Sequence, residues 1–467
     1  LNARALDPGQ SVVIEACAGS GKTWLLVSRI VRLLLADVRP SEILAITFTR
    51  KAAQEMQARL HEWLHFLAIG SDDEVAQFLR DREVPEERIE AMLPRARSLF
   101  ESFLSDQPGI TISTFHGWFL QLLKRAPLAA GAANGASLVD HVSSLIDEAW
   151  DSFAGELQRE PEGQLAGSLR WLFERYGLVS TRALLTSFVQ KRAEWWAYTR
   201  SQPDPVKFAL ENLHQEMPVA PDADVVGEVF SDSGIGHALT EYADLLEANE
   251  VSGDVGRALQ LRRASEQADP AGRFDLVWPV LMTGEGTLRA RKATKATGKR
   301  LGEAGQQRLL SLHAQLGEIL QGARALLDEQ GVYRLNEAGL SCGARLLERY
   351  QSIKRARGVI DYTDVEWQSW LLLSTSDYAE YMQYRLDARY RHILLDEFQD
   401  TNPLQWQSLK AWLDASADVQ SRPGVFLVGD PKQSIYRFRR AEPRLFDVAR
   451  AYLNERHGAQ ALEQNVT

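Results

Sequence analysis

The stretch Arg391–Asn402, which reads RHILLDEFQDTN, indicates the fold of this chain. It opens with an apolar run, Ile393–Leu395, long enough for one buried strand of a parallel sheet. Two carboxylates, Asp396 and Glu397, follow where that strand should end. Ligands of open α/β sheets bind at the carboxyl ends of the strands. The pair therefore predicts a site in which one acid holds a metal ion and the other activates water.

Such a site needs a phosphate cradle, and the sequence supplies one far upstream. Residues 11–16 (SVVIEA) favour a strand, and the segment after Thr23 has the apolar spacing of a helix. Between them lies ACAGSGKT, a turn of small residues in which Ala16 replaces the usual first glycine. The cradle would consist of Ala18, Gly19, Ser20, Gly21, Lys22 and Thr23. In this pattern backbone N–H groups and Lys22 bind phosphates, and the Thr23 hydroxyl ligates Mg²⁺. A glycine turn followed by a chance lysine is the alternative.

Polar and aromatic residues also follow three further expected strands, at residues 43–47, 110–114 and 424–429. Phe48 could stack on a base, a contact worth ~1–3 kcal/mol, although composition alone favours a core phenylalanine. His116 could face a groove or simply cap its strand. Gln433 could reach a terminal phosphate through its amide. Tyr436, Phe438 and the interleaved arginines have the aromatic and basic composition of a single-strand binding surface.

The middle of the chain is mainly helical in pattern, from about residue 124 to about residue 385. The simplest topology is one parallel-sheet domain interrupted by a helical insertion. Within the first part, Leu60–Leu104 also has a helical period, which we expect Pro85 and Pro94 to break. Arg289–Arg300 carries six basic residues and no acidic one. A solvated basic loop is the favoured interpretation there, and phosphate contact is the alternative.

Composition limits the class of protein. The chain has 467 residues, of which 45% are hydrophobic and 25% charged, as in soluble globular proteins of more than one domain. Two cysteines are too few for a disulfide framework, which fits the cytoplasm. No apolar run approaches a membrane span. The net charge of −10 argues against indiscriminate nucleic-acid binding and leaves room for a local basic groove.

Five segments together resemble successive motifs of UvrD/Rep-type superfamily 1 helicases, in the same order. They are AxAGSGKT at 16–23, TFTRKAAQEM at 47–56, STFHGW at 113–118, LLDEFQDTN at 394–402 and VGDPKQSIYRFRRA at 428–441. The large insertion, the DYTD segment at 361–364 and the wording DPKQSIYRFR are most similar to the AddA/RecB branch of helicase–nucleases.

The resemblance implies an α/β fold, with a RecA-like P-loop NTPase domain (1A) interrupted by a mainly helical insertion (1B). Domain 1A would comprise residues 1–120 and 385–467, and 1B residues 121–384. It also implies an ATP-driven motor that moves 3′ to 5′ on single-stranded DNA. Such a motor acts at DNA ends in repair and recombination, and can work with a partner subunit of a helicase–nuclease complex.

The same resemblance implies a role for each matching residue. Lys22 would bind the β- and γ-phosphates, Thr23 and Asp396 would hold Mg²⁺, and Glu397 would be the general base. Gln433 would sense the γ-phosphate and link it to DNA. The positions expected to contact DNA are Phe48, Thr49, Arg50, His116, Tyr436, Phe438 and Arg439. Arg50 stands where many relatives have Asn. Trp24 could stack near the adenine base or could equally be a packed core residue. Gln399 and Asp400 are expected to couple the acid pair to the neighbouring motif.

Near its end, Leu462–Asn465 resembles the lead-in to the family's next motif, which contributes an arginine to the γ-phosphate. We therefore expect an N-terminal motor fragment that lacks the second RecA-like domain and any nuclease domain. Such arginines can contribute ~10³–10⁵ in rate, so this fragment should not unwind DNA by itself. A non-catalytic, nucleotide-gated DNA-binding or scaffold subunit is the alternative function. The motifs do not distinguish DNA from RNA.

Overall fold

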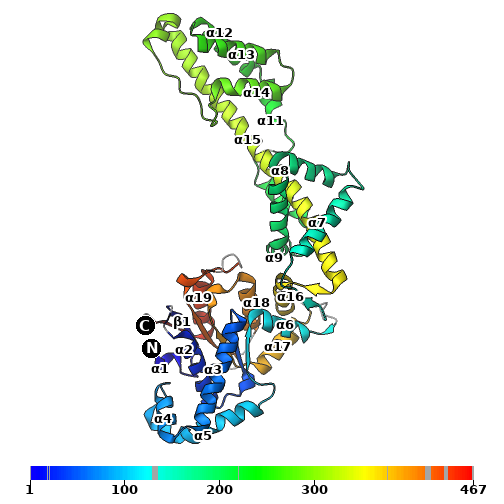
Figure 1. Ribbon diagram of the computed structural model, residues 1–467. Coiled ribbons are helices and arrows are strands. Elements are labelled where there is room, and N and C mark those ends of the chain that lie inside the picture. Colours follow the sequence, from blue (N-terminus) through cyan, green and yellow to red (C-terminus); the bar gives the residue numbers. More distant parts are fainter. Residues whose placement is uncertain are drawn as a thin grey trace. The chain divides into compact units, whose positions relative to one another are not determined.

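The computed structural model describes residues 2–17, 19, 21–128, 135–218, 220–375, 377–415, 422–435 and 440–464. The chain divides into two compact units (Figure 1). The first is formed by residues 1–143 and 354–467, and the second by residues 144–353. The first unit is therefore built from both ends of the sequence. Residues 121–143 and 354–384, next to the insertion, also belong to it.

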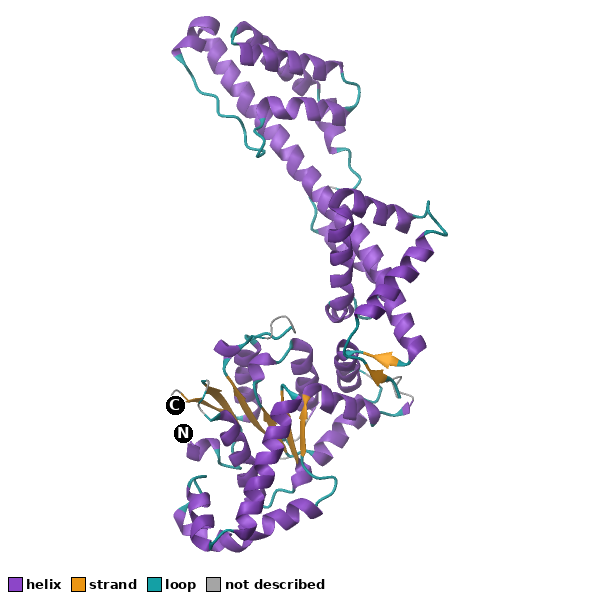
Figure 2. Cartoon of the chain, in the orientation of Figure 1, coloured by secondary structure: helices purple, strands orange, loops and turns teal. Residues whose placement is uncertain are grey.

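The first unit is organised around a six-stranded sheet with the order β3-β2-β6-β7-β1-β8 (Figure 2). All of its neighbouring strands pair in parallel. The strands are β1 (Val12–Ala16), β2 (Ile43–Thr47), β3 (Thr111–Thr114), β6 (His392–Leu395), β7 (Gly424–Gly429) and β8 (Gln460–Gln464). A two-stranded parallel pair, β4 (Ser137–Leu138) and β5 (Val359–Ile360), lies outside this sheet. The parallel α/β class expected from the sequence is confirmed.

Alternate residues of a strand point to opposite sides of the sheet. Helices cover both of these faces. Ile14 and Phe426 pack into one core, whereas Val13 and Leu427 pack into the other. The first core also takes in α2 (Lys22–Leu35), α3 (Arg50–Ile69), α4 (Asp72–Arg80) and α5 (Glu86–Ser105). The second takes in α6 (Phe115–Lys124), α16 (Tyr362–Ser374), α17 (Ala379–Arg389), α18 (Pro403–Ala415) and α19 (Leu445–His457). Burial on both faces explains why the strands read as continuous apolar runs.

Two features of the first unit differ from expectation. Pro94 does not break its helix but lies inside α5, where a proline removes one backbone hydrogen bond without ending the helix. Strand β8 was also not expected, because its residues QALEQ lack the β-branched side chains typical of strands. Among the strands of the described residues, β8 lies at the edge of the sheet and pairs with β1, so its open side can be polar.

The second unit is helical in its described part. Its elements are α7 (Ser143–Leu157), α8 (Gln164–Gln190), α9 (Arg192–Tyr198), α10 (Pro205–Gln215), α11 (Val225–Ser231), α12 (Ser233–Ala248), α13 (Ser252–Glu266), α14 (Pro270–Leu281) and most of α15 (Lys295–Arg357). The apolar stripe of α15 packs into a core through Leu309, Leu312, Leu316 and Leu320. None of the helices in the described ranges combines the length and apolar composition needed to cross a bilayer.

The basic segment 289–300 is only partly a solvated loop, because some of its arginines hold the fold. Arg291 donates to the buried carboxylate of Asp254 at 2.7 Å. Arg300 donates to the backbone carbonyl of Asn249 at 3.0 Å. From Lys295 onward the segment is already the start of α15. These contacts give part of its charge a structural role within the second unit.

Candidate functional site

The turn between β1 and α2 is the place where the sequence predicts a phosphate cradle. Gly19 and Gly21 have φ angles of 76° and 82°, a left-handed conformation that favours glycine at both positions. Gly21 caps α2 without any side-chain hydrogen bond, and the first turn of α2 carries no acidic residue. The N–H groups of a helix's first turn have no partner within the helix and attract anions. Ala18 and Ser20, also assigned to this cradle, lie outside the described residues.

Lys22, the first residue of α2, reaches directly to the acid pair. Its Nζ donates to Oε2 of Glu397 at 2.7 Å. The side chain of Lys22 is 10% exposed and that of Glu397 is 34% exposed, so solvent screens this ion pair only in part. Glu397 has a φ of 48°, an uncommon conformation for a residue other than glycine. Strained backbone of this kind tends to occur at functional sites.

Asp396 is buried at the end of β6, next to the last residue of β2. It accepts hydrogen bonds from the Thr47 hydroxyl at 3.3 Å and from the Glu397 backbone N–H at 3.0 Å. Burial, reinforced by the negative charge of Glu397, raises the pKa of Asp396 to about 6. The charged form of this carboxylate is therefore disfavoured, and a bound cation would stabilise that form.

A relay of side chains connects Glu397 to the end of β7. Gln399 donates through Nε2 to Oε2 of Glu397 at 2.7 Å, and its Oε1 accepts from the backbone N–H of Asp430 at 2.9 Å. Gln433 donates its amide to the Asp430 carboxylate. Gln433 is therefore linked to the acid pair through Asp430 and Gln399 rather than by contact. Asp430 was missed in the sequence, although its place directly after a buried strand was a usable signal.

Trp24 lies among packed side chains. Its ring is 5.6 Å from the guanidinium of Arg82, which also stacks on Trp63 at 4.0 Å and on Phe78 at 3.2 Å. Trp24 is partly buried against the core that contains α2 to α5. Arg82 is only 4% exposed, and this burial lowers its pKa to about 9. Of the two interpretations of Trp24, these contacts favour the packed core residue.

A cavity of about 560 Å³ lies at the carboxyl ends of β2 and β3 and brings together four of the expected DNA contacts. They are Phe48, Thr49, Arg50 and His116. Thr49 also caps α3, because its hydroxyl accepts a hydrogen bond from the Ala52 N–H at 3.0 Å. Arg50, in the first turn of α3, is exposed. The remaining three, Tyr436, Phe438 and Arg439, lie outside the described residues. Arg440, which follows them, lines the same cavity.

His116 is held in this cavity by Glu366, a residue of α16 that no sequence motif singles out. Its Nε2 lies 2.8 Å from Oε1 of Glu366. The same oxygen accepts from Asn402 Nδ2 at 2.7 Å and from Gln405 Nε2 at 2.8 Å. Burial opposes the charge of Glu366, but the contacts with His116, Asn402 and Gln405 prevail and lower its pKa. Asn402 and Gln405 follow the acid pair in sequence, so one segment spans the acid pair and the cavity.

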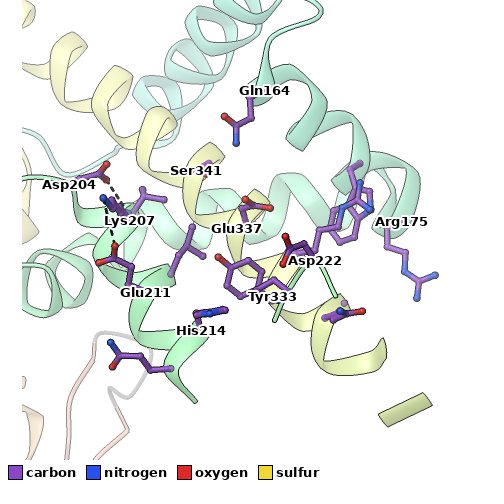
Figure 3. Close-up of a pocket in the computed structure, with 18 residues that line it drawn as sticks. Gln164, Arg175, Asp204, Lys207, Glu211, His214, Asp222, Tyr333, Glu337 and Ser341 are labelled. Carbon is purple, nitrogen blue, oxygen red and sulfur yellow. Dashed lines mark hydrogen bonds and ion pairs between the residues drawn. The ribbon is translucent and has the colours of Figure 1, made fainter. Parts of the chain in front are cut away.

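A larger cavity, of about 1440 Å³, lies within the second unit (Figure 3). None of the residues expected to carry chemistry lines it. Two of its charged side chains, Lys207 and Glu211, are already paired with each other. Nζ of Lys207 lies 3.7 Å from Oε1 of Glu211. The carboxylate of Asp204 accepts a hydrogen bond from the backbone N–H of Lys207 at 3.0 Å. The sheet edge of the first unit is therefore the better candidate for the active site.

Comparison with known proteins gives a consistent result. The model of the UvrD/REP helicase N-terminal domain matches residues 2–452. The chain is 28% identical to an ATP-dependent helicase/nuclease subunit of type A from Lactobacillus delbrueckii subsp. bulgaricus, over 95% of this chain and 36% of that protein. It is 27% identical to the protein of the same name from Bacillus licheniformis, over 94% of this chain and 35% of that protein. The chain thus spans about a third of the length of these relatives.

Proposed function

Because this chain belongs to the UvrD/REP helicase N-terminal domain family, we propose that it is the ATP-binding motor lobe of a DNA helicase of the helicase–nuclease type. The complete protein would hydrolyse ATP to move 3′ to 5′ along single-stranded DNA, in the repair or recombination of DNA ends. The relatives are named as subunits of a helicase/nuclease, which supports a partner subunit for this protein too.

The observation that carries this proposal is the ion pair of Lys22 with Glu397, beside the buried Asp396. It brings the phosphate cradle after β1 together with the acid pair after β6. Lys22 and the open N-terminus of α2 would bind the phosphates of ATP. Glu397 would hold the attacking water and accept its proton, a task for which its side chain is sufficiently exposed.

The residues present fit a magnesium ion bound together with the nucleotide. The described residues contain no group of three or more His, Cys, Asp or Glu side chains placed to hold a metal by themselves. Mg²⁺ commonly takes only one or two protein oxygens and completes its shell with phosphates and water. Thr23 and Asp396 would supply those protein oxygens. The ion would neutralise charge that develops on the phosphates.

The relay through Gln399 and the anchoring of His116 by Glu366 support coupling between hydrolysis and nucleic acid. Both connections start from the segment that carries Asp396 and Glu397. A change in the position of Glu397 could therefore reach Asp430 through Gln399. The same segment could move His116 in the cavity through Asn402 and Glu366.

ATP hydrolysis by the complete protein, with and without single-stranded DNA, tests this function. DNA should stimulate hydrolysis, and Glu397→Gln should abolish most of the stimulated rate. Glu101→Gln, at an exposed position of α5, makes the same change in charge and should have no effect. Stimulation by RNA alone would redirect the proposal to RNA. An unaffected Glu397→Gln variant would refute the catalytic assignment and favour a non-catalytic role.

A further inference from the structure

A smaller pocket of the first unit lies at the opposite edge of the sheet from the nucleotide site. It has a volume of about 450 Å³ and is lined by residues of α6 and α17 and by the residue that follows each helix. Arg389, in its wall, donates through Nη2 to Oγ1 of Thr111, the first residue of β3, at 3.1 Å. Tyr390, also in its wall, lies just before β6 begins. The pocket is therefore at the amino ends of these strands, whereas the acid pair follows the carboxyl end of β6.

The pocket is positively charged, because its walls contain Arg125, Arg385 and Arg389 and no aspartate or glutamate. None of these guanidinium groups forms an ion pair with a carboxylate of a described residue. The side-chain hydrogen bonds that Arg385 and Arg389 make to described residues go to neutral hydroxyl groups. Asp387, which lies between these two arginines in sequence, accepts instead from the indole N–H of Trp412 at 2.7 Å. The positive charge of the pocket is therefore left uncompensated by its own walls.

This concentration of charge favours a bound anion. Like charges gathered in one concave wall repel one another. Burial, together with the nearby charge of Arg125, lowers the pKa of Arg389. Guanidinium groups bind carboxylates and phosphates through paired N–H donors, and an anion held between them would remove their repulsion. The pocket is therefore suited to an anionic group.

The surface beside the pocket indicates that this anion belongs to a protein. Tyr381 and Tyr384 of α17 are 48% and 72% exposed. Tyr384 lines the pocket, and the guanidinium of Arg385 lies 5.6 Å from the ring centroid of Tyr381. Tyrosine and arginine are among the residues that most often carry the binding energy of protein interfaces. This face of α17 thus combines a place for an anion with exposed aromatic rings.

A nucleic-acid strand is a less suitable occupant. Its phosphates follow one another along the backbone and are bound by cations arranged along a groove. The three arginines instead converge on one pocket. The expected DNA contacts that the structure describes also lie elsewhere, in the cavity at the carboxyl ends of β2 and β3.

We propose that this pocket binds an acidic segment of a partner protein, with a glutamate or aspartate carboxylate held by Arg125, Arg385 and Arg389. A side chain next to that carboxylate would pack on the exposed ring of Tyr384. The proposal rests on the proposed function only in assuming a partner protein. It involves neither nucleotide nor DNA, so the two can fail separately.

The test measures binding of a fluorescein-labelled peptide of six glutamates and one tyrosine to this chain by fluorescence anisotropy. A peptide with glutamines in place of the glutamates has the same length and no side-chain carboxylate. Both are measured at about 0.15 M salt, where exposed charges more than about 8 Å apart are largely screened. We expect the glutamate peptide to bind about tenfold or more tightly than the glutamine peptide.

Arg125→Gln is the informative substitution, because the Arg125 side chain is exposed and its loss should not affect folding. It should weaken binding of the glutamate peptide by about fivefold, the upper end for one exposed ion pair. Arg385→Gln, also at an exposed position, should have the same effect. Arg59→Gln is the matched control. It makes the same change in charge at an exposed position of α3 and should bind the peptide as the unmodified chain does.

Two competitors identify the source of the anion. Neither an excess of oligo-deoxythymidine nor millimolar inorganic phosphate should displace the glutamate peptide. Displacement by the oligonucleotide would show that strand phosphates occupy the pocket, and displacement by phosphate alone would show that it takes a free anion. Either result would overturn the assignment to a protein partner.

Two further results would also overturn the proposal. Equal binding of the two peptides to the unmodified chain would show that no carboxylate is selected. Unchanged binding of the glutamate peptide by both Arg125→Gln and Arg385→Gln would place the peptide outside this pocket. These results leave the proposed function untouched, because ATP hydrolysis and Glu397→Gln test that function at the other edge of the sheet.

Discussion

The ammonium of Lys22 lies 2.7 Å from Oε2 of Glu397, although 375 positions separate the two residues in the sequence. The order of strands explains this proximity. β1, which leads to Lys22, and β6, which leads to Glu397, are separated in the sheet only by β7. Since all three strands are parallel, their carboxyl ends meet at one edge. The helical insertion therefore leaves the two halves of the site undisturbed.

Glu397→Gln should separate binding from hydrolysis. A phosphate has to compete with Glu397 for the ammonium of Lys22, so an uncharged amide should leave ATP affinity equal or raise it by up to about tenfold. The DNA-stimulated rate of the complete protein should fall by about 100-fold or more, as expected for loss of a general base. Titration with a fluorescent ATP analogue and a steady-state ATPase assay measure the two effects. A variant that loses ATP binding would contradict this assignment of roles.

Trp24→Phe should change stability and spare nucleotide binding. Trp24 faces the guanidinium of Arg82, so the smaller ring should lower the free energy of unfolding by about 1 kcal/mol. The dissociation constant for ATP should stay within about twofold. Trp63→Phe, which alters the same stack from α3, is the control and should behave alike. If Trp24→Phe alone weakened ATP binding fivefold or more, Trp24 would belong to the base-binding site instead.

Gly429→Ala should disturb the relay by displacing Gln399. A Cβ at this position would lie 2.8 Å from Oε1 of Gln399 and 2.9 Å from Cε2 of Phe446, closer than real atoms pack. We expect a loss of about 1–3 kcal/mol in the free energy of unfolding. DNA-stimulated hydrolysis should fall as well, because Gln399 must move away from Glu397. Gly9→Ala, where the nearest atom is 3.6 Å away, is the control for urea unfolding. Equal stability of the two variants would contradict this packing.

His392 should make the first unit less stable in mild acid. Burial, reinforced by the charge of Arg29, lowers the pKa of His392 to about 4, whereas an unfolded histidine titrates near 6.5. Between these values the unfolded chain binds a proton that the folded chain does not. The free energy of unfolding should therefore fall as the pH drops from about 6.5 to 4, by up to about 3 kcal/mol.

The measurement compares urea unfolding at pH 7.5 and pH 5 for the unmodified chain and for His392→Gln. The variant should show a smaller loss of stability between the two pH values. His65→Gln, at an exposed position of α3, should retain the full loss. An identical pH dependence in all three proteins would show that His392 is not the group responsible.

Much of this architecture could be predicted because buried parallel strands leave a strong signal. Apolar runs such as Ile393–Leu395 pack on both faces of the sheet. Their residues are therefore apolar at every position and do not alternate with polar ones. β8 was missed because an edge strand can be polar on its open side. The helix through Pro94 was missed because packing against the core compensates for one lost backbone hydrogen bond.

The two sites differed in how far they could be predicted, for a physical reason. The cradle and the acid pair are local in sequence, with glycines and carboxylates at fixed spacing. Glu366 acts through contacts with His116 and Asn402, which lie 250 and 36 positions away. No local pattern marks a residue whose importance comes from such partners. Asp430 is a different case, because its place directly after a buried strand was a usable signal; its backbone N–H donates to Gln399 and its carboxylate accepts from Gln433.

Binding of Mg-ATP to this chain tests the central claim most directly, by comparing the unmodified protein with Lys22→Ala. The ammonium should make charge-assisted bonds to phosphate, so its removal should weaken binding by about tenfold or more. Lys51→Ala, at an exposed lysine paired with Glu55 on α3, should bind as the unmodified chain does. If the unmodified chain binds Mg-ATP and Lys22→Ala binds it equally well, the site at Lys22 and Glu397 is not the nucleotide site.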